Sequence, residues 1–258
     1  MTGSGVRVFH PVARTLVVGL CGLSAAGCDQ PPPRQSLVDV FIDMTEIEEL
    51  GGDASHLQEN LDEIIGMVTG EDHRLDYGTI TIFPIYDFAS STPKIAAISR
   101  GSRNDNRLNR LGEIAAFRSE VESGIHDLLS KFADFKTSVG STYLESYIVE
   151  PVCRRLEHVG DPGADWHVII FSDMLEKSTI LSFYDENQTD EEVLEALERN
   201  CLPDRPLPRV CLQVVYQPLK ANDRRVLRAR RIWQEFFRGR EAGEAGGCLH
   251  FDTFLHLD

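Results

Sequence analysis

Hydrophobic residues in this chain follow two patterns: short continuous runs, and longer stretches with helical spacing. Runs rich in β-branched and aromatic residues are typical of strands that are buried on both faces of a parallel sheet. Five such runs cover residues 37–42, 78–86, 166–172, 210–216 and 248–254. A sixth run, 94–99, follows the second across a Ser-Ser-Thr-Pro turn, so we expect it to return antiparallel beside that run.

Between these runs, apolar residues recur every three or four positions, which predicts amphipathic helices. The expected helices cover residues 57–68, 108–135, 142–152, 189–197 and 222–238. The stretch 108–135 is either one long helix or two helices joined near Gly112 or Gly124. The helix over 142–152 is expected to begin at Thr142.

Strands therefore alternate with helices along most of the chain. This order predicts an α/β fold with three layers, in which helices flank a mainly parallel central sheet of about six strands. The chain has 258 residues, which is enough for one large domain of this kind. No period of 20 to 50 residues repeats, so a solenoid is not expected.

Residues 1–27 do not share this pattern. Arg7 and Arg14 precede an apolar run over 15–23 that is too short to span a bilayer and is typical of an export signal. The small residues before Cys28 resemble a bacterial lipobox, in which the cysteine receives diacylglycerol, although Ala25 stands where leucine is usual. The alternative is an ordinary signal peptide that is cleaved after small residues.

The lipobox resemblance implies that Cys28 is the lipidated N-terminus of a protein anchored in the bacterial cell envelope. Asp29 resembles a retention signal for the inner membrane, so we expect the chain on its periplasmic face. Residues 28–35 form a proline-rich tether, extended by about 3 Å per residue, and residues 36–258 form the domain.

The overall charge excludes one class of partner. The chain has 26 basic and 41 acidic residues, with a formal net charge of −15. Such a surface repels nucleic acid, and no basic–aromatic RNA or DNA motif is present. Residues 220–240 depart from this average, with eight basic side chains and two acidic ones. We expect these cations either to pair with neighbouring acids or to face anionic headgroups or an acidic partner.

Two of the strand-like runs end in an aspartate, Asp43 and Asp173, and a Gly-Ser-Thr turn ending at Thr142 lies between them. Ligands of open parallel sheets gather outside the carboxyl ends of the strands. Carboxylate and hydroxyl oxygens are ligands that Mg²⁺ accepts, so these residues are candidates for a metal site.

Taken in order, Asp43-x-Thr45, Gly140-Ser141-Thr142 and Phe171-Ser172-Asp173 resemble the metal-ion-dependent adhesion site of the von Willebrand factor A domain, over residues 36–255. The resemblance implies Mg²⁺ or Mn²⁺, with Thr45 and Thr142 as hydroxyl ligands and Asp173 as a carboxylate. Asp43 would act on the ion directly or through one of its ligands. Ile47 stands where the family has a second serine, so weak binding is expected. The alternative is that the two aspartates only cap helix N-termini.

The resemblance implies a membrane-tethered domain that binds a protein partner, whose acidic group would complete the metal site. The alternatives are a metal-free structural scaffold of an envelope complex and a metal-assisted hydrolase. No H-E-x-x-H or G-x-S-x-G motif and no convincing nucleophile–base pair is present, so we do not expect an enzyme.

Four cysteines remain in the expected domain: Cys153, Cys201, Cys211 and Cys248. They allow three pairings, and an exported compartment favours disulfides over free buried thiols. Cys211 and Cys248 open consecutive strands that lie side by side in this fold, so we expect them to pair. Cys153 is then left to pair with Cys201.

Overall fold

The computed structural model describes residues 35–45, 55–69, 77–86, 93–99, 106–139, 147–159, 164–201, 207, 210–216, 223–240, 248–253 and 255. These residues belong to one compact unit, Pro33–Asp258. The expected export signal, Cys28 and the start of the tether lie outside the described residues, as do Ile47 and Thr142. In the described part of the chain, no helix is long and apolar enough to cross a membrane.

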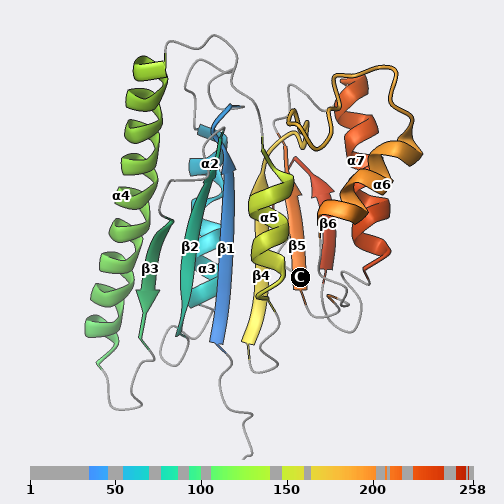
Figure 1. Cartoon of the computed structure of the whole chain (residues 1–258). Helices are drawn as coiled ribbons and strands as arrows, with labels where there is room; N and C mark the ends of the chain where they lie inside the picture. Colours follow the sequence, from blue (N-terminus) through green and yellow to red (C-terminus); the bar gives the residue numbers. More distant parts are fainter. Residues whose placement is uncertain are drawn as a thin grey trace, which may run out of the picture. The chain divides into compact units, whose positions relative to one another are not determined.

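Six strands form one sheet in the order β3-β2-β1-β4-β5-β6 (Figure 1). Their bounds are β1 Gln35–Asp43, β2 Tyr77–Ile85, β3 Lys94–Ile98, β4 Ala164–Phe171, β5 Val210–Val215 and β6 Cys248–Asp252. The antiparallel pair is β2 with β3, and every other neighbouring pair is parallel. The predicted α/β fold with a mainly parallel sheet is therefore confirmed.

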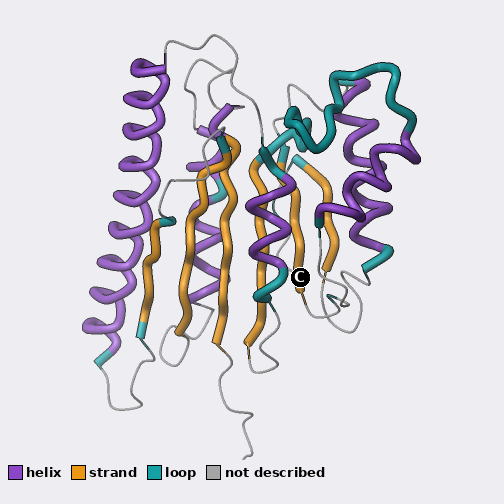
Figure 2. The backbone as a smooth tube through the Cα atoms, in the orientation of Figure 1, coloured by secondary structure: helices purple, strands orange, loops and turns teal. Residues whose placement is uncertain are grey.

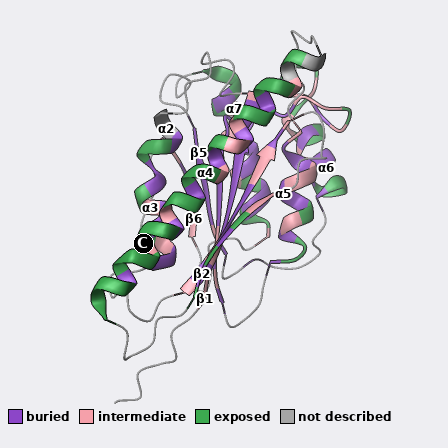
Figure 3. Cartoon of the chain, turned by 90° about the vertical axis from the view of Figure 1, so that its left-hand side faces the viewer, coloured by how far each residue is buried: buried purple, intermediate pink, exposed green. Residues whose placement is uncertain are grey.

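Helices cover both faces of this sheet and complete the three predicted layers (Figure 3). One face carries α2 Ser55–Glu59, α3 Leu61–Thr69 and α4 Arg107–Val139, and the other carries α5 Val149–Leu156, α6 Asp190–Asn200 and α7 Arg224–Arg238. Neighbouring residues of β1 enter different cores: Val40 packs with the first set of helices and Phe41 with the second. Burial on both faces explains why the strand is continuously apolar.

The first strand begins slightly earlier than the sequence indicated. Gln35, which was expected to end the tether, pairs with Tyr77 of β2 and with Ala164 of β4. A residue with strand partners on both sides belongs to the sheet, so β1 already starts at Gln35.

Two expectations about helices are settled by the structure. The predicted helix over 57–68 is two helices, because the chain turns at Asn60 and the N–H of Ile64 donates to the Asn60 carbonyl to open α3. The stretch 108–135 is one helix, α4, without a break at either glycine. At Gly124 a Cβ would lie 3.4 Å from Cβ of Lys94, so the glycine allows α4 to approach β3 closely.

The expected start of the next helix at Thr142 is wrong. Tyr147 and Ile148 are not helical, and α5 begins at Val149. Pro151 is then the third helical residue, where its missing N–H has no helical acceptor to lose. A helix from Thr142 would place Pro151 in its interior, where the ring clashes with the carbonyl four residues earlier.

Both predicted disulfides are present in the structure. Cys211 and Cys248 are register partners on β5 and β6, and their Cα atoms lie 4.1 Å apart. Cys153 of α5 joins Cys201, which follows α6, with a Cα separation of 4.9 Å. The first bridge fixes two strands to each other, and the second fixes two helices of the same layer.

Candidate functional site

The candidate site lies where β1 and β4 end side by side. These strands are parallel, and Ile42 is the register partner of Phe171, so the residues that follow them meet at the same edge of the sheet. Ser172 hydroxyl donates to Oδ2 of Asp43 at 2.8 Å. The sequence expectation that the two strand ends converge is met by this contact between residues 129 positions apart.

Asp43 is 1% exposed and organises the residue that was predicted to bind a metal. The backbone N–H and the hydroxyl of Thr45 both donate to Oδ1 of Asp43, at 3.0 and 2.6 Å. Because the Thr45 hydroxyl donates a hydrogen bond to the carboxylate, the lone pairs of its oxygen can still face a cation. Thr45 thus fits the role of a hydroxyl ligand, while its N–H contact is the one expected if Asp43 only caps a turn.

A long loop follows β4 (Figure 2). Polar side chains at its start accept hydrogen bonds from its own backbone. Asp173 is 6% exposed, and its Oδ1 accepts from the N–H of Leu175 at 3.0 Å. The Ser172 hydroxyl, besides donating to Asp43, accepts from the N–H of Met174 at 2.9 Å. Ser172 therefore joins the end of β1 to the backbone of this loop.

Met174 holds an unusual backbone conformation within this loop. Its φ is 60°, in the left-handed region that costs a residue with a side chain about 1–2 kcal/mol. The residue is buried, and its carbonyl accepts from Nε1 of the fully buried Trp233 at 3.2 Å. The contact from α7 therefore holds the loop in a conformation that it would not adopt by itself.

Glu176 is a buried acid beside the candidate site. Its side chain is fully buried, and Oε2 accepts from the N–H groups of Ile148 and Val149 at the start of α5. Oε1 has no hydrogen-bond partner among the described residues. Burial, helped by a smaller contribution from the negative charge of Asp43, raises the pKa of Glu176 to about 7 against the hydrogen bonds that lower it. Near neutral pH this carboxyl group is therefore close to half protonated.

Sequence reasoning missed the roles of Ser172 and Glu176. Ser172 was part of the motif only as the neighbour of Asp173, and its contact with Asp43 depends on the register of β1 and β4. Glu176 carried no signal that separates a buried acid from the many exposed ones in an acidic chain. Its burial follows from the position of α5, because the carboxylate accepts a hydrogen bond from the N–H of Val149 at the start of that helix.

The predicted metal set is brought together only in part. Asp43 and Thr45 are in contact, and Ser172 links them to the loop of Asp173, whereas Thr142 lies outside the described residues. Within the described ranges, no group of three or more His, Cys, Asp or Glu side chains could hold a metal ion. The predicted set differs from such groups because half of its ligands are hydroxyls. Metal binding stays a prediction.

A second buried carboxylate lies on the same strand as Asp43. Asp39 is 1% exposed, and its two oxygens accept from Nε and a terminal nitrogen of Arg155 at 2.8 and 3.0 Å. The guanidinium also lies over two rings, 5.6 Å from the centre of Phe83 and 5.2 Å from that of Trp166. Burial raises the pKa of Asp39, against the hydrogen bonds and the charge of Arg155, which lower it.

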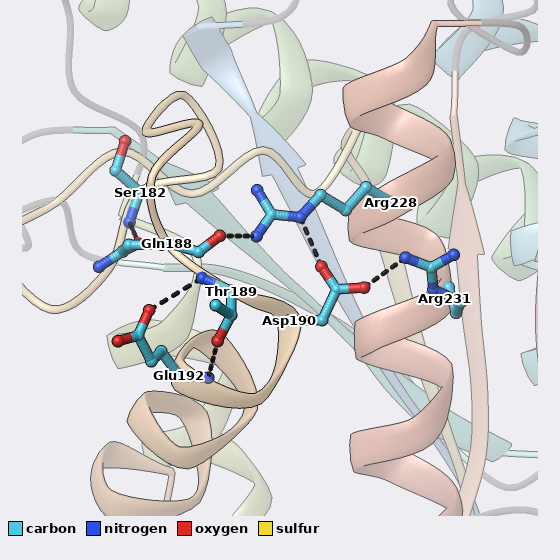
Figure 4. A network of polar contacts seen from close by, with 7 residues as sticks. All are labelled: Ser182, Gln188, Thr189, Asp190, Glu192, Arg228 and Arg231. Carbon is cyan, nitrogen blue, oxygen red and sulfur yellow. Dashed lines mark hydrogen bonds and ion pairs between the residues drawn. The ribbon is translucent and has the colours of Figure 1, made fainter.

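Two arginines of α7, Arg228 and Arg231, make internal contacts (Figure 4). Nε of Arg228 donates to Asp190 at 2.7 Å, and Arg231 pairs with the other oxygen of that carboxylate. Asp190 is the first residue of α6 and directly follows the N-cap Thr189, which forms a capping box with Glu192. The interpretation that these cations pair with neighbouring acids is thus confirmed for Arg228 and Arg231.

Comparisons with known proteins give little further information. No family model matches the chain, and no curated protein matches it. Among solved structures, it is similar to the human COPII-coat protein Sec24c, with 13% sequence identity and a TM-score of 0.42. The match covers 86% of this chain and 30% of that chain. A similarity at this level carries no argument about function.

Proposed function

We propose that this chain is an extracytoplasmic domain of the von Willebrand factor A type that binds a protein partner at the ends of β1 and β4. The observation that carries the proposal is the cluster of Asp43, Thr45 and Ser172 at the carboxyl ends of two neighbouring parallel strands. This is the edge at which open parallel sheets bind ligands. The cluster presents oxygen atoms that suit a hard cation.

In this proposal, Thr45 and Asp173 bind Mg²⁺ or Mn²⁺ together with Thr142. Asp43 orients Thr45 by accepting a hydrogen bond from its hydroxyl group. An acidic side chain of the partner supplies the ligand position that Ile47 leaves unfilled. The cation would then contribute most of the charge attraction between the two proteins.

The compartment forms part of the same proposal. Cys28 carries the lipid, and the domain stands at the periplasmic face of the inner membrane. The lipobox-like residues before Cys28 and the two disulfides of the domain support an exported protein. Cys28→Ser should leave an unprocessed or soluble protein, and globomycin should block maturation. A normally matured soluble form of Cys28→Ser would contradict the anchor.

Calorimetric titration with Mg²⁺ and Mn²⁺ tests the metal site. Replacing Asp43 or Asp173 by asparagine should weaken the binding, and Ile47→Ser should strengthen it by restoring a hydroxyl ligand. Asp62→Asn is the control, because Asp62 is an exposed acid that pairs with Arg118 of α4 and is not a member of the predicted metal set. Absence of metal-binding heat in both the parent and Ile47→Ser would contradict the metal site.

A metal-free scaffold is the second candidate. Both carboxylate oxygens of Asp43 already accept hydrogen bonds from protein groups, so the cluster can be stable without an ion. The same titration distinguishes the two functions. We do not propose a hydrolase, since Glu176, whose pKa of about 7 would suit a base, is fully buried and bonded to α5.

A further inference from the structure

One part of the sheet is left open on the face that carries α5. In the described part of the chain, no helix lies over β2 and β3 on this face, whereas α3 and α4 cover them from the other (Figure 1). Ile95 of β3 is 61% exposed and is the register partner of Thr81, which in turn pairs with Asp39. Register partners share a face of a sheet, so Ile95 lies on the side of Asp39 and α5.

A cavity of about 290 Å³ lies between α5 and this open part of the sheet. Its apolar lining consists of Phe83, Pro84, Pro93 and Pro151. A cavity of this size and composition is large enough for one apolar side chain. The exposed Ile95 extends the apolar surface along β3.

One wall of the cavity is held rigidly. Arg155 lines it and is tied to Asp39 by two hydrogen bonds, with its guanidinium against the rings of Phe83 and Trp166. Because this wall is already ordered before binding, the entropy that is lost on binding is smaller.

Two further polar residues stand on the α5 side of the cavity. Arg154 of α5 and His158, which lies in the turn after the helix ends at Leu156, both line it. The side chain of Arg154 is 67% exposed and pairs with Glu150, which is 43% exposed. An exposed pair of this kind contributes little, so another carboxylate can exchange with Glu150.

We propose that this groove binds an extended segment of a protein partner in which a carboxylate side chain adjoins a large apolar one. The apolar side chain fills the cavity over Phe83, and the carboxylate binds Arg154 and His158. Ile95, which β3 turns to this face beside the groove, is uncharged, so Arg154 and His158 set the preference for an acid. The groove goes beyond the proposed strand-end site and does not require its cation.

The test uses ¹⁵N-labelled protein and three capped dipeptides: acetyl-Asp-Phe-amide, acetyl-Asn-Phe-amide and acetyl-Asp-Ala-amide. Acetyl-Asp-Phe-amide should shift the amide signals of Phe83, Ile95 and Arg154 in a saturable way. Loss of the charge should weaken the binding about tenfold, because the hydrogen bonds from the cationic side chains to the carboxylate are lost. Loss of the ring should weaken it by a similar factor, because the apolar area that fills the cavity is lost.

Variants at Arg154 and His158 locate the binding at this wall of the cavity. Arg154→Gln and His158→Gln should each weaken acetyl-Asp-Phe-amide several-fold and leave acetyl-Asn-Phe-amide unchanged. Arg118→Gln is the matched control. Arg118 is an exposed arginine of α4 that pairs with Glu122, four residues later, just as Arg154 pairs with Glu150, four residues earlier. Equal shifts with all three dipeptides, or unchanged binding in both the Arg154 and the His158 variant, would overturn the proposal.

Discussion

Two aspartates of β1, Asp39 and Asp43, lie four residues apart on the same face of one strand, and each is 1% exposed. Asp39 is neutralised by the guanidinium of Arg155, which makes two hydrogen bonds with it. Asp43 is held by the hydroxyls of Thr45 and Ser172 and by a backbone N–H. The same residue type on the same strand is thus stabilised by a fixed cation in one place and by hydroxyl groups in the other.

Position along the strand explains this difference. Asp39 lies in the middle of β1, between Thr81 of β2 and Val168 of β4, where a buried charge needs a partner from the helix layer above. Asp43 ends the strand, where the following loops bring hydroxyls and N–H groups to it. The first arrangement stabilises the fold, and the second leaves oxygen atoms at an edge where a ligand can bind.

The largest effect on stability is expected from removing the guanidinium that pairs with Asp39. Arg155→Met leaves Asp39 as an uncompensated buried charge and should lower the free energy of unfolding by about 3–5 kcal/mol. Arg154→Met is the control, because its exposed side chain should change stability by less than about 0.5 kcal/mol. Urea unfolding measures both. Similar losses in the two variants would show that the Asp39 pair is not the source of the stability.

The next largest effect on stability is expected at Glu176, whose pKa is raised in part by the charge of Asp43. Its folded-state pKa of about 7 lies above the ordinary value of 4.5, so folding favours the protonated acid. The resulting stability is complete below pH 4.5 and is lost as the pH rises through 7, by about 3 kcal/mol in total. Glu176→Gln should remove this loss, which unfolding measured between pH 4.5 and 8.5 will show. An unchanged pH profile in the variant would contradict the pKa assignment.

A smaller effect is expected at Asp43 itself. Asp43→Asn keeps the shape of the side chain but replaces an oxygen by an NH₂ group facing Thr45 or Ser172, and should cost about 1–2 kcal/mol. Because the charge of Asp43 raises the pKa of Glu176, the variant should also lower that pKa. Unfolding at several pH values measures both changes. A loss as large as that of Arg155→Met would remove the distinction between the two aspartates.

The smallest effect on stability is expected when one of the two hydrogen bonds from Thr45 to Asp43 is removed. Thr45→Val removes the hydroxyl and keeps the N–H contact, so stability should fall by about 1 kcal/mol. If Thr45 binds the cation, the same variant should lose measurable Mg²⁺ binding in calorimetry. Thr45→Ser is the control that keeps the hydroxyl. Equal metal binding in the valine and serine variants would exclude Thr45 as a ligand.

The strands, most of the helices and the fold class could be predicted from the amino-acid sequence. These features depend on the spacing of apolar residues within a segment, as in the continuous run that becomes β1 and the capped start of α6 at Thr189. The sequence also placed Asp43 at a strand end and indicated both disulfides, because Cys211 and Cys248 open successive strands. Local spacing failed at Pro151, whose position rules out a helix beginning at Thr142.

The contacts between polar groups, in contrast, became visible only in the folded protein. The partners of Asp39 and Asp43 come from residues 116 and 129 positions away, Arg155 and Ser172. Neither contact leaves a periodic trace in the sequence, since each depends on the register between strands and on the placement of α5. The burial of Glu176 and the open face beside Ile95 have the same origin. They follow from which elements lie against each other, and that is fixed only when the whole sheet and its helices have packed.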